Sequence, residues 1–303
     1  MKRVLDKLRF VRIFPKISVF VKIDPEYKWC LNAANNLVNK EVLEPRYGAY
    51  YQTSFHKAYD GISERSAIHI SFGSSRTGSY ISFECTPHKL TDTEWNSVRE
   101  ILTKLFGGPE VVAEEFLLSE VELAVDIPYP MKDFIFLVPK FRSQNLEFYK
   151  RGTLEIGSKK GNRWIRIYNK KMQLQKVKGL VVPDPLTRIE YVRRRLKISL
   201  ASCLSIPNPF NEIIVVPRNK IGEIQKMNPT DIGLSSFAKE ISKGVTGHSA
   251  YWHLEDADMR KCIVKLIRPY ALNLAGSTVS WNDWLVPELN NLKDKFKPNA
   301  KKK

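Results

Sequence analysis

The sequence lacks the features that would place it in several large classes of protein. Its few cysteines form no C-x-x-C pair and no zinc-ligand cluster; they are Cys30, Cys85, Cys203 and Cys262. There is no G-x-x-x-x-G-K-[ST] loop, which argues against ATP use. No run approaches the roughly 20 apolar residues of a membrane-spanning helix. Charges interrupt the N-terminus, which has no signal-peptide core. We therefore expect a cytoplasmic protein with buried thiols in a reducing compartment.

Acidic residues are scarce compared with basic ones. The chain has 49 Lys and Arg against 32 Asp and Glu, for a formal net charge of +17. A surplus of this size repels itself unless a polyanion is near, so nucleic acid is the natural partner. A merely soluble basic protein and an anionic membrane surface are the alternatives. The hydrophobic content of 43% is ordinary for a globular chain and argues against disorder.

The patterns of apolar residues and turn formers predict an α+β fold. Its central sheet is expected to be largely antiparallel, with helices on one face and an open charged face. Strands are predicted at Lys16–Ile23, Ala67–Phe72, Tyr80–Cys85, Phe116–Ile127, Gly152–Gly157, Arg163–Lys170 and Leu186–Arg195. Helices are predicted at Trp29–Lys40 and Glu94–Phe106, the second opened by a capping box of Thr91 and Glu94.

The character of the chain changes after Pro207 and Pro209, where the remainder becomes mainly helical. Four helices are predicted there, at Ile221–Met227, Ser235–Ser242, Asp258–Ala271 and Trp281–Phe296, followed by a basic tail ending in Lys301–Lys303. We therefore predict two domains, residues 1–205 and residues 206–303, with a soft boundary near residue 205.

The central strands combine an apolar face with a charged face. Successive strand side chains point to opposite faces. In RWIRIYNK this puts Ile165 and Ile167 on a core face and Tyr168 on the other face, between Arg166 and Lys170. The strands near it divide in the same way. A solvated outer face is the ordinary alternative, but acids, bases and aromatic residues together suit a site that handles phosphate.

Phosphodiester transesterification is the chemistry that fits this face. A tyrosine oxygen can attack phosphorus and hold the DNA end covalently. Because free tyrosine has a pKa near 10, it needs flanking cations or a base at neutral pH. Mg²⁺ or Mn²⁺ on carboxylates would polarise the phosphate. Glu122 and Asp126 lie roughly 13 Å apart along one strand, too far to share an ion. Asp126 with Glu190, or with Glu155, is the better pair.

Three segments resemble a family when they are taken in order. SEVELAVDI, GTLEIGSKKGNRWIRIYNKK and LTRIEYVRRR, over about residues 115–198, resemble successive motifs of the replication initiation factors of small rolling-circle plasmids. The relaxases of some integrative elements belong to the same family. The resemblance implies a nick in the plus strand at a double-strand origin, a 5′-phosphotyrosyl link and a 3′-OH primer. It also implies origin duplex, single strand and a helicase as partners.

The resemblance carries site residues over by position. Tyr168 falls on the tyrosine of the R-x-Y-x-K motif and becomes the candidate nucleophile. The family's basic positions fall on Arg166, Lys170 and Arg188, and its acidic positions on Glu122, Asp126 and Glu190. With Glu155 from the strand pattern, these acids form the predicted metal set. A second cleavage by a single tyrosine would require a second subunit, so we expect a homodimer.

The chain departs from the family pattern at several positions. Val192 stands where a second acid is frequent, Gln173 where a glutamate often follows the tyrosine strand, and Gly161 where serine is usual. These departures concern the metal ligands more than the nucleophile. Tyr149 and Tyr191 are rival nucleophiles, of which Tyr191 shares a face with Ile189 and should be buried.

Further residues outside the catalytic set, all basic except Trp164, are candidates for DNA contacts. They are Lys159, Lys160, Arg163, Trp164 and Arg194 around the central strands, and Arg260, Lys261, Lys265 and Arg268 on a helix of the C-terminal region. A solvated helix face is the alternative for the second group. Two other functions stay open: a relaxase with the same chemistry, and a noncatalytic sequence-specific DNA-binding initiator or repressor.

Overall fold

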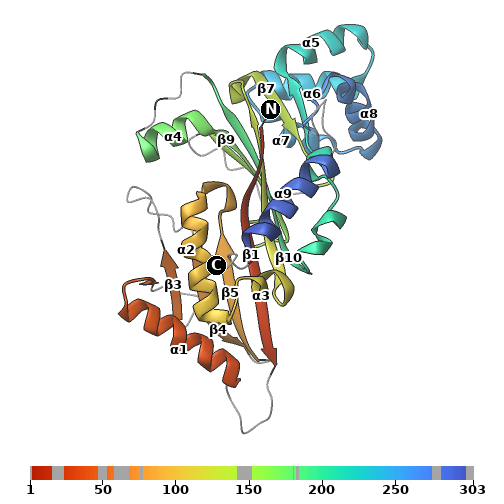
Figure 1. Ribbon diagram of the computed structural model, residues 1–303. Coiled ribbons are helices and arrows are strands. Elements are labelled where there is room, and N and C mark those ends of the chain that lie inside the picture. Colours follow the sequence, from red (N-terminus) through yellow and green to blue (C-terminus); the bar gives the residue numbers. More distant parts are fainter. Residues whose placement is uncertain are drawn as a thin grey trace. The chain divides into compact units, whose positions relative to one another are not determined.

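The chain forms two compact units that interleave along the sequence. The computed structural model describes residues 2–15, 24–46, 53–57, 68–75, 78–141, 152–179, 181, 184–274 and 281–297 (Figure 1). Unit 1 comprises Met1–Arg3, Ala124–Val192 and Pro207–Trp281, and unit 2 comprises Val4–Leu123, Arg193–Ile206 and Asn282–Lys303. The predicted division into residues 1–205 and residues 206–303 stays a prediction. The expected strand Lys16–Ile23, Tyr149 and the tail Lys301–Lys303 lie outside the described residues.

Unit 2 is built on antiparallel strands. They are β1 (Lys2–Pro15), β2 (Glu44–Arg46), β3 (Thr53–Lys57), β4 (Ile68–Ser75) and β5 (Gly78–Cys85). The hydrogen-bonded order is β2-β3-β4-β5-β1, and β6 (Leu117–Ile127) follows β1. Each pairing from β2 to β1 is antiparallel. The predicted strands on either side of residues 73–79 pair with each other as β4 and β5. Strand β1 was not predicted.

The helices of unit 2 are α1 (Pro25–Asn39), α2 (Asp92–Phe106), α3 (Glu110–Glu114) and α9 (Trp281–Lys295). Figure 1 shows α1 and α2 on one face of β4 and β5. The predicted capping box is confirmed, because the Thr91 backbone donates to Glu94 at 2.6 Å and Thr91 Oγ1 accepts from the Glu94 backbone at 3.3 Å. The ring of Trp95 on α2 packs edge-on against Phe296, just after α9, with centroids 5.7 Å apart.

Unit 1 holds the strands that carry the predicted catalytic residues. Its strand order is β6-β10-β9-β8, with β8 at Thr153–Gly157, β9 at Arg163–Asn169 and β10 at Thr187–Ile198; the last residues of β10 belong to unit 2. Strands β8 and β9 form the predicted hairpin, and their register sets Thr153 opposite Tyr168. The predicted strand end at Lys170 is wrong, because Asn169 caps a helix, α4 (Lys170–Lys178), that starts there.

The helical part of unit 1 has a core of its own. Helices α5 (Arg218–Met227), α6 (Ile232–Ser242), α7 (Gly247–His253) and α8 (Ala257–Ile267) pack with a two-stranded antiparallel sheet of β7 (Phe134–Leu137) and β11 (Ile214–Pro217). Figure 1 shows α5, α6 and α8 gathered beside one another. Helix α8 stops before the predicted end at Ala271, because Arg268–Tyr270 forms a 3-10 turn that contains a proline.

The fold class predicted from the sequence is confirmed. The strand pairings described above are antiparallel, and the C-terminal region is mainly helical. Across the residues that the structure describes, no helix is both long and apolar enough to cross a lipid bilayer.

Candidate functional site around Tyr168

The side chain of Tyr168 lies beneath a layer of cations on β9. Ile165 and Ile167 fill the core on one face of the strand, as the alternation predicts. The opposite face is less open than expected, since Tyr168 is only 6% exposed. The cations cover it: the Arg166 guanidinium lies 5.4 Å and the Lys170 ammonium 5.7 Å from the centre of the phenol ring. Cations above an aromatic face are attracted to its negative quadrupole.

A carboxylate holds the Tyr168 hydroxyl in place. The hydroxyl donates to Oε1 of Glu190 at 2.5 Å, and the Nε of Arg166 donates to Oε2 of the same carboxylate at 2.6 Å. The Nζ of Lys170 lies 3.5 Å from the Tyr168 oxygen. Glu190, on β10, is 1% exposed. A hydroxyl and a possible base are therefore within hydrogen-bonding distance, in a site from which water is largely excluded.

The surroundings of Tyr168 favour its protonated form. Burial raises the pKa of the phenol well above its usual value, and the negative charge and hydrogen bond of Glu190 raise it further. Arg188 and Arg166 act in the opposite direction but do not outweigh these effects. The flanking cations thus leave Tyr168 neutral at physiological pH, and its oxygen could act as a nucleophile only with a base to take its proton.

The other predicted acids of unit 1 each have their own cation. Asp126 accepts a two-pronged hydrogen bond from Arg188, at 2.6 Å and 2.7 Å, and both side chains are buried. Glu155 forms an ion pair with Lys159 at 3.1 Å. Asp126, Glu155 and Glu190 thus each contact a different cation, and their roles as metal ligands stay predictions.

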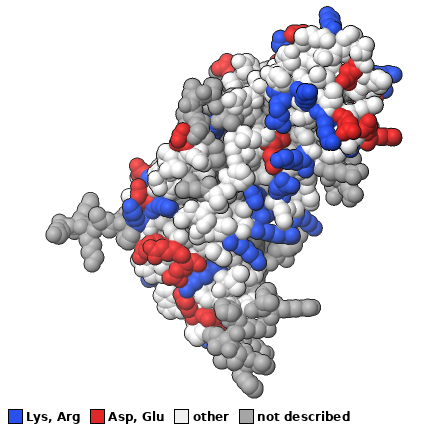
Figure 2. All heavy atoms as spheres, turned by 90° about the vertical axis from the view of Figure 1, so that its right-hand side faces the viewer, with Lys and Arg blue, Asp and Glu red and all other residues white. Residues whose placement is uncertain are grey.

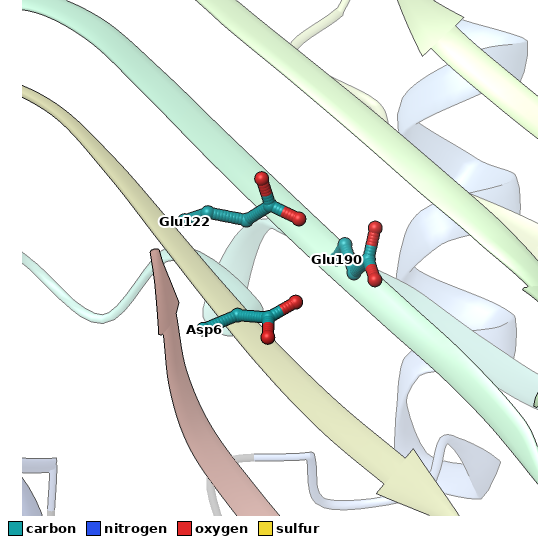
Figure 3. Close-up of side chains that lie close together, drawn as sticks. All are labelled: Asp6, Glu122 and Glu190. Carbon is teal, nitrogen blue, oxygen red and sulfur yellow. The ribbon is translucent and has the colours of Figure 1, made fainter. Parts of the chain in front are cut away.

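Two carboxylates of unit 2 face each other. Oxygens of Asp6 and Glu122 lie within 4.8 Å of one another. Figure 3 labels both side chains: Asp6 comes from β1 and Glu122 from β6. His88 lies 3.2 Å from Asp6, and Lys7 lies 3.9 Å from Glu122. Oxygen donors of this kind suit Mg²⁺ or Mn²⁺. Asp6 was not among the predicted ligands.

Glu120, on the same strand as Glu122, forms ion pairs with several cations. It lies 2.8 Å from Lys7, 3.4 Å from Arg9 and 2.8 Å from Arg194. Burial opposes its negative charge, but these cations outweigh burial and lower the pKa of Glu120 below its usual value. Arg194, a predicted DNA contact, is therefore held by an ion pair within unit 2.

The predicted DNA contacts around the hairpin differ in exposure. Lys159 and Lys160 are exposed in the turn that follows β8. Arg163 is exposed, lies 3.3 Å from Glu212 and stacks over the ring of Phe141 at 4.6 Å. Trp164 is 7% exposed, which leaves little of its ring for stacking against a base.

The predicted contacts on α8 also have distinct surroundings. Arg260 donates to the Glu255 carbonyl at 3.0 Å and lies over Trp252, so it braces the preceding loop. Lys261, Lys265 and Arg268 are exposed, at the spacing of one helix face. Figure 2 shows Lys and Arg side chains over the face that it draws, with acidic side chains between some of them.

Tyr168 also forms part of a cleft that the sequence did not indicate. The cleft has a volume of about 210 Å³ and lies between the start of β8 and helix α4. Its walls include Met172 and Lys176, both on the helix that was missed. Of the rival nucleophiles, Tyr191 is buried as predicted, at 3% exposed.

Comparisons with known proteins give a structural neighbour. No family model matches the chain, and no curated protein matches it. Among solved structures, the chain is similar to a rolling circle replication initiator protein from Geobacillus stearothermophilus, with 14% identity over 67% of this chain and 77% of that chain and a TM-score of 0.37.

Proposed function

We propose that this protein is a rolling-circle replication initiator that nicks and rejoins one DNA strand, with Tyr168 as the nucleophile. The observation that carries the proposal is the hydrogen bond from the Tyr168 hydroxyl to Glu190, with Arg166 on the carboxylate and Lys170 beside the phenol oxygen. A tyrosine held between a base and cations has what phosphoryl transfer needs. The ordered motifs of residues 115–198 support the same function.

The nicking step is a transesterification. The Tyr168 oxygen attacks the phosphorus as its proton passes to Glu190, and a bond forms between that oxygen and phosphorus. The bond from phosphorus to the 3′ oxygen of the neighbouring nucleotide breaks, and that oxygen takes up a proton. The products are a 5′-phosphotyrosyl link and a free 3′-OH. Rejoining is the reverse reaction, with the 3′-OH as nucleophile.

Cations around Tyr168 would stabilise the charge that develops on the phosphate oxygens. Arg166 and Lys170 are the nearest to the phenol ring. Arg188 is held in place by Asp126, which acts as a positioning residue for that guanidinium. Fixed charges in a buried site require little rearrangement during the reaction, which is why they stabilise a transition state better than water does.

Asp6 and Glu122 are the residues that would hold a divalent cation in unit 2. Their donor atoms are all oxygens, and Glu122 is 8% exposed, so its carboxylate is largely shielded from bulk water. Bound Mg²⁺ or Mn²⁺ would supply Lewis-acid polarisation of a phosphoryl oxygen. The other predicted ligands are Asp126, Glu190 and Glu155. We assign Glu190 to the Tyr168 hydroxyl and Asp126 to the Arg188 guanidinium.

DNA would bind through the exposed cations. Lys261 and Lys265 on α8 and Arg268 just after it suit the phosphates of origin duplex, and Lys159 and Lys160 suit a single strand near the hairpin. The direct test is incubation with labelled single-stranded oligonucleotides and Mn²⁺, followed by a denaturing gel and peptide mapping of any covalent adduct. An adduct on Tyr168 supports the proposal, and the lack of any adduct rejects it.

A further inference from the structure

The cleft at Tyr168 has a defined shape and composition. Its lining comes from the start of β8, the end of β9 and one face of α4: Gly152, Thr153, Arg166, Tyr168, Asn169, Met172, Gln173 and Lys176. Asn169, Met172, Gln173 and Lys176 follow the i, i+3, i+4, i+7 spacing of a single helix face. At about 210 Å³, the cleft is smaller than the roughly 300–1,000 Å³ pockets that hold drug-sized molecules. This volume suits one flat ring and part of the chain to which the ring is attached.

The lining favours an anion with a flat, partly apolar group. Among the described residues that line the cleft there are cations, Arg166 and Lys176, but no carboxylate. Met172 is an apolar side chain left 41% exposed at the wall. Its thioether adapts its shape to a neighbouring ring and makes favourable contacts with aromatic groups. A nucleotide combines these properties, because its base is flat and its phosphate is negative.

Gln173 links the cleft to the nucleophile. Its Oε1 accepts a hydrogen bond from Lys170 at 2.8 Å, and the same ammonium lies 3.5 Å from the Tyr168 oxygen. The amide nitrogen of Gln173 carries two N–H donors, the groups that read acceptor atoms on a base edge. A base in the cleft would therefore contact Gln173. Gln173 is hydrogen-bonded to Lys170, and Lys170 lies beside the Tyr168 oxygen.

We propose that the cleft binds the nucleotide adjacent to the scissile phosphate, and that Gln173 determines which base is accepted there. This inference rests on the proposed function, since it assumes that Tyr168 attacks DNA. Met172 packs against the base, and Lys176 contacts the neighbouring phosphate. Helix α4 is thus the specificity element of the site, while β9 and β10 carry the residues that react.

The experiment uses the full-length protein and a pool of single-stranded oligonucleotides randomised around one central position, with Mn²⁺. Covalent adducts and released 3′-OH fragments are sequenced, which gives the base preference at each position relative to the nick. Wild type, Gln173→Ala, Gln173→Glu and Gln175→Ala are compared. Gln175 is an exposed glutamine of the same helix outside the cleft lining, and it serves as the matched control.

We expect the wild type to select a base at one position next to the nick. Gln173→Ala should reduce that preference about tenfold, the order of magnitude of one lost base contact, while adducts still form. Gln173→Glu, which replaces donors with acceptors, should change the preferred base. Gln175→Ala should keep the wild-type profile.

Two results would overturn the inference, and they can be told apart. If wild type forms adducts but has no preference next to the nick, or if both Gln173 variants keep its preference, the inference fails while the proposed function stands. If wild type forms no adduct with any member of the pool, the proposed function fails and the inference fails with it.

Discussion

Tyr168 donates a hydrogen bond of 2.5 Å to Glu190, a residue on a different strand and 22 positions later in the chain. Arg166 holds the other oxygen of that carboxylate. A hydrogen bond to a charged group is worth about 1.5–3 kcal/mol, so the contact fixes the phenol firmly. The same carboxylate favours the protonated phenol at rest and offers a place for its proton during reaction.

Glu190→Gln should slow adduct formation by about 100-fold or more, because an amide can accept the hydrogen bond but cannot take the proton. Single-turnover adduct formation with a labelled oligonucleotide measures the rate. Glu223→Gln on α5, where the native carboxylate pairs with Lys220, is the control and should react at the wild-type rate. A Glu190→Gln protein that reacts as fast as wild type would remove Glu190 from the role of base.

The raised pKa of Tyr168 predicts how stability depends on alkaline pH. The folded state holds this proton more tightly than the unfolded chain, whose tyrosines have a pKa of about 10. The stabilisation is therefore fully present below about pH 10 and is lost as the pH rises through the higher folded value. Urea unfolding above pH 10 should show a steeper loss of unfolding free energy for wild type than for Tyr168→Phe. Parallel curves would contradict the assignment.

Removal of one partner from the buried pair of Asp126 and Arg188 should destabilise the fold strongly. Arg188→Ala leaves the Asp126 carboxylate buried without its guanidinium, and we expect a loss of about 3–5 kcal/mol in unfolding free energy. Replacing both residues with apolar side chains, Asp126→Leu with Arg188→Met, should restore most of that loss. Urea unfolding at neutral pH measures both. A single variant as stable as wild type would show that the pair is not buried in solution.

Metal binding can be tested without any reaction. Asp6→Asn and Glu122→Gln should each weaken Mn²⁺ binding about tenfold or more, as measured by calorimetry, because each removes a charged oxygen ligand. Glu26→Gln removes a carboxylate that is paired with Arg12 elsewhere in unit 2, and it should leave the affinity unchanged. Equal affinities for wild type and the Asp6 and Glu122 variants would exclude this pair as the metal site.

The sequence predicted which face of β9 carries Tyr168 but not how deeply it is buried. Alternation within one strand is a local property, and it correctly separates Ile165 and Ile167 from Tyr168. Burial depends on groups that are remote in the chain or outside the strand. Glu190 reaches Tyr168 from β10, and Lys170 covers it from the first turn of α4.

Strand β1 shows where the sequence interpretation failed. Frequent charges in the first residues hid an alternation in which Leu8 and Phe10 are buried while Lys7 and Arg9 reach the charged face. That alternation was the available signal for Asp6 as a candidate ligand. Partner choice is harder to predict, since Asp126 could be matched to Arg188 only after the register of neighbouring strands was known.

The central claim is that Tyr168 forms the covalent bond to DNA. Wild type and Tyr168→Phe are incubated with labelled single-stranded oligonucleotides and Mn²⁺, resolved on a denaturing gel and digested for peptide mapping. We expect a wild-type adduct on the peptide that contains Tyr168, and none with Tyr168→Phe, which should still bind the oligonucleotides. An adduct formed by Tyr168→Phe, or a wild-type adduct that maps to Tyr149 or Tyr191, would contradict the account.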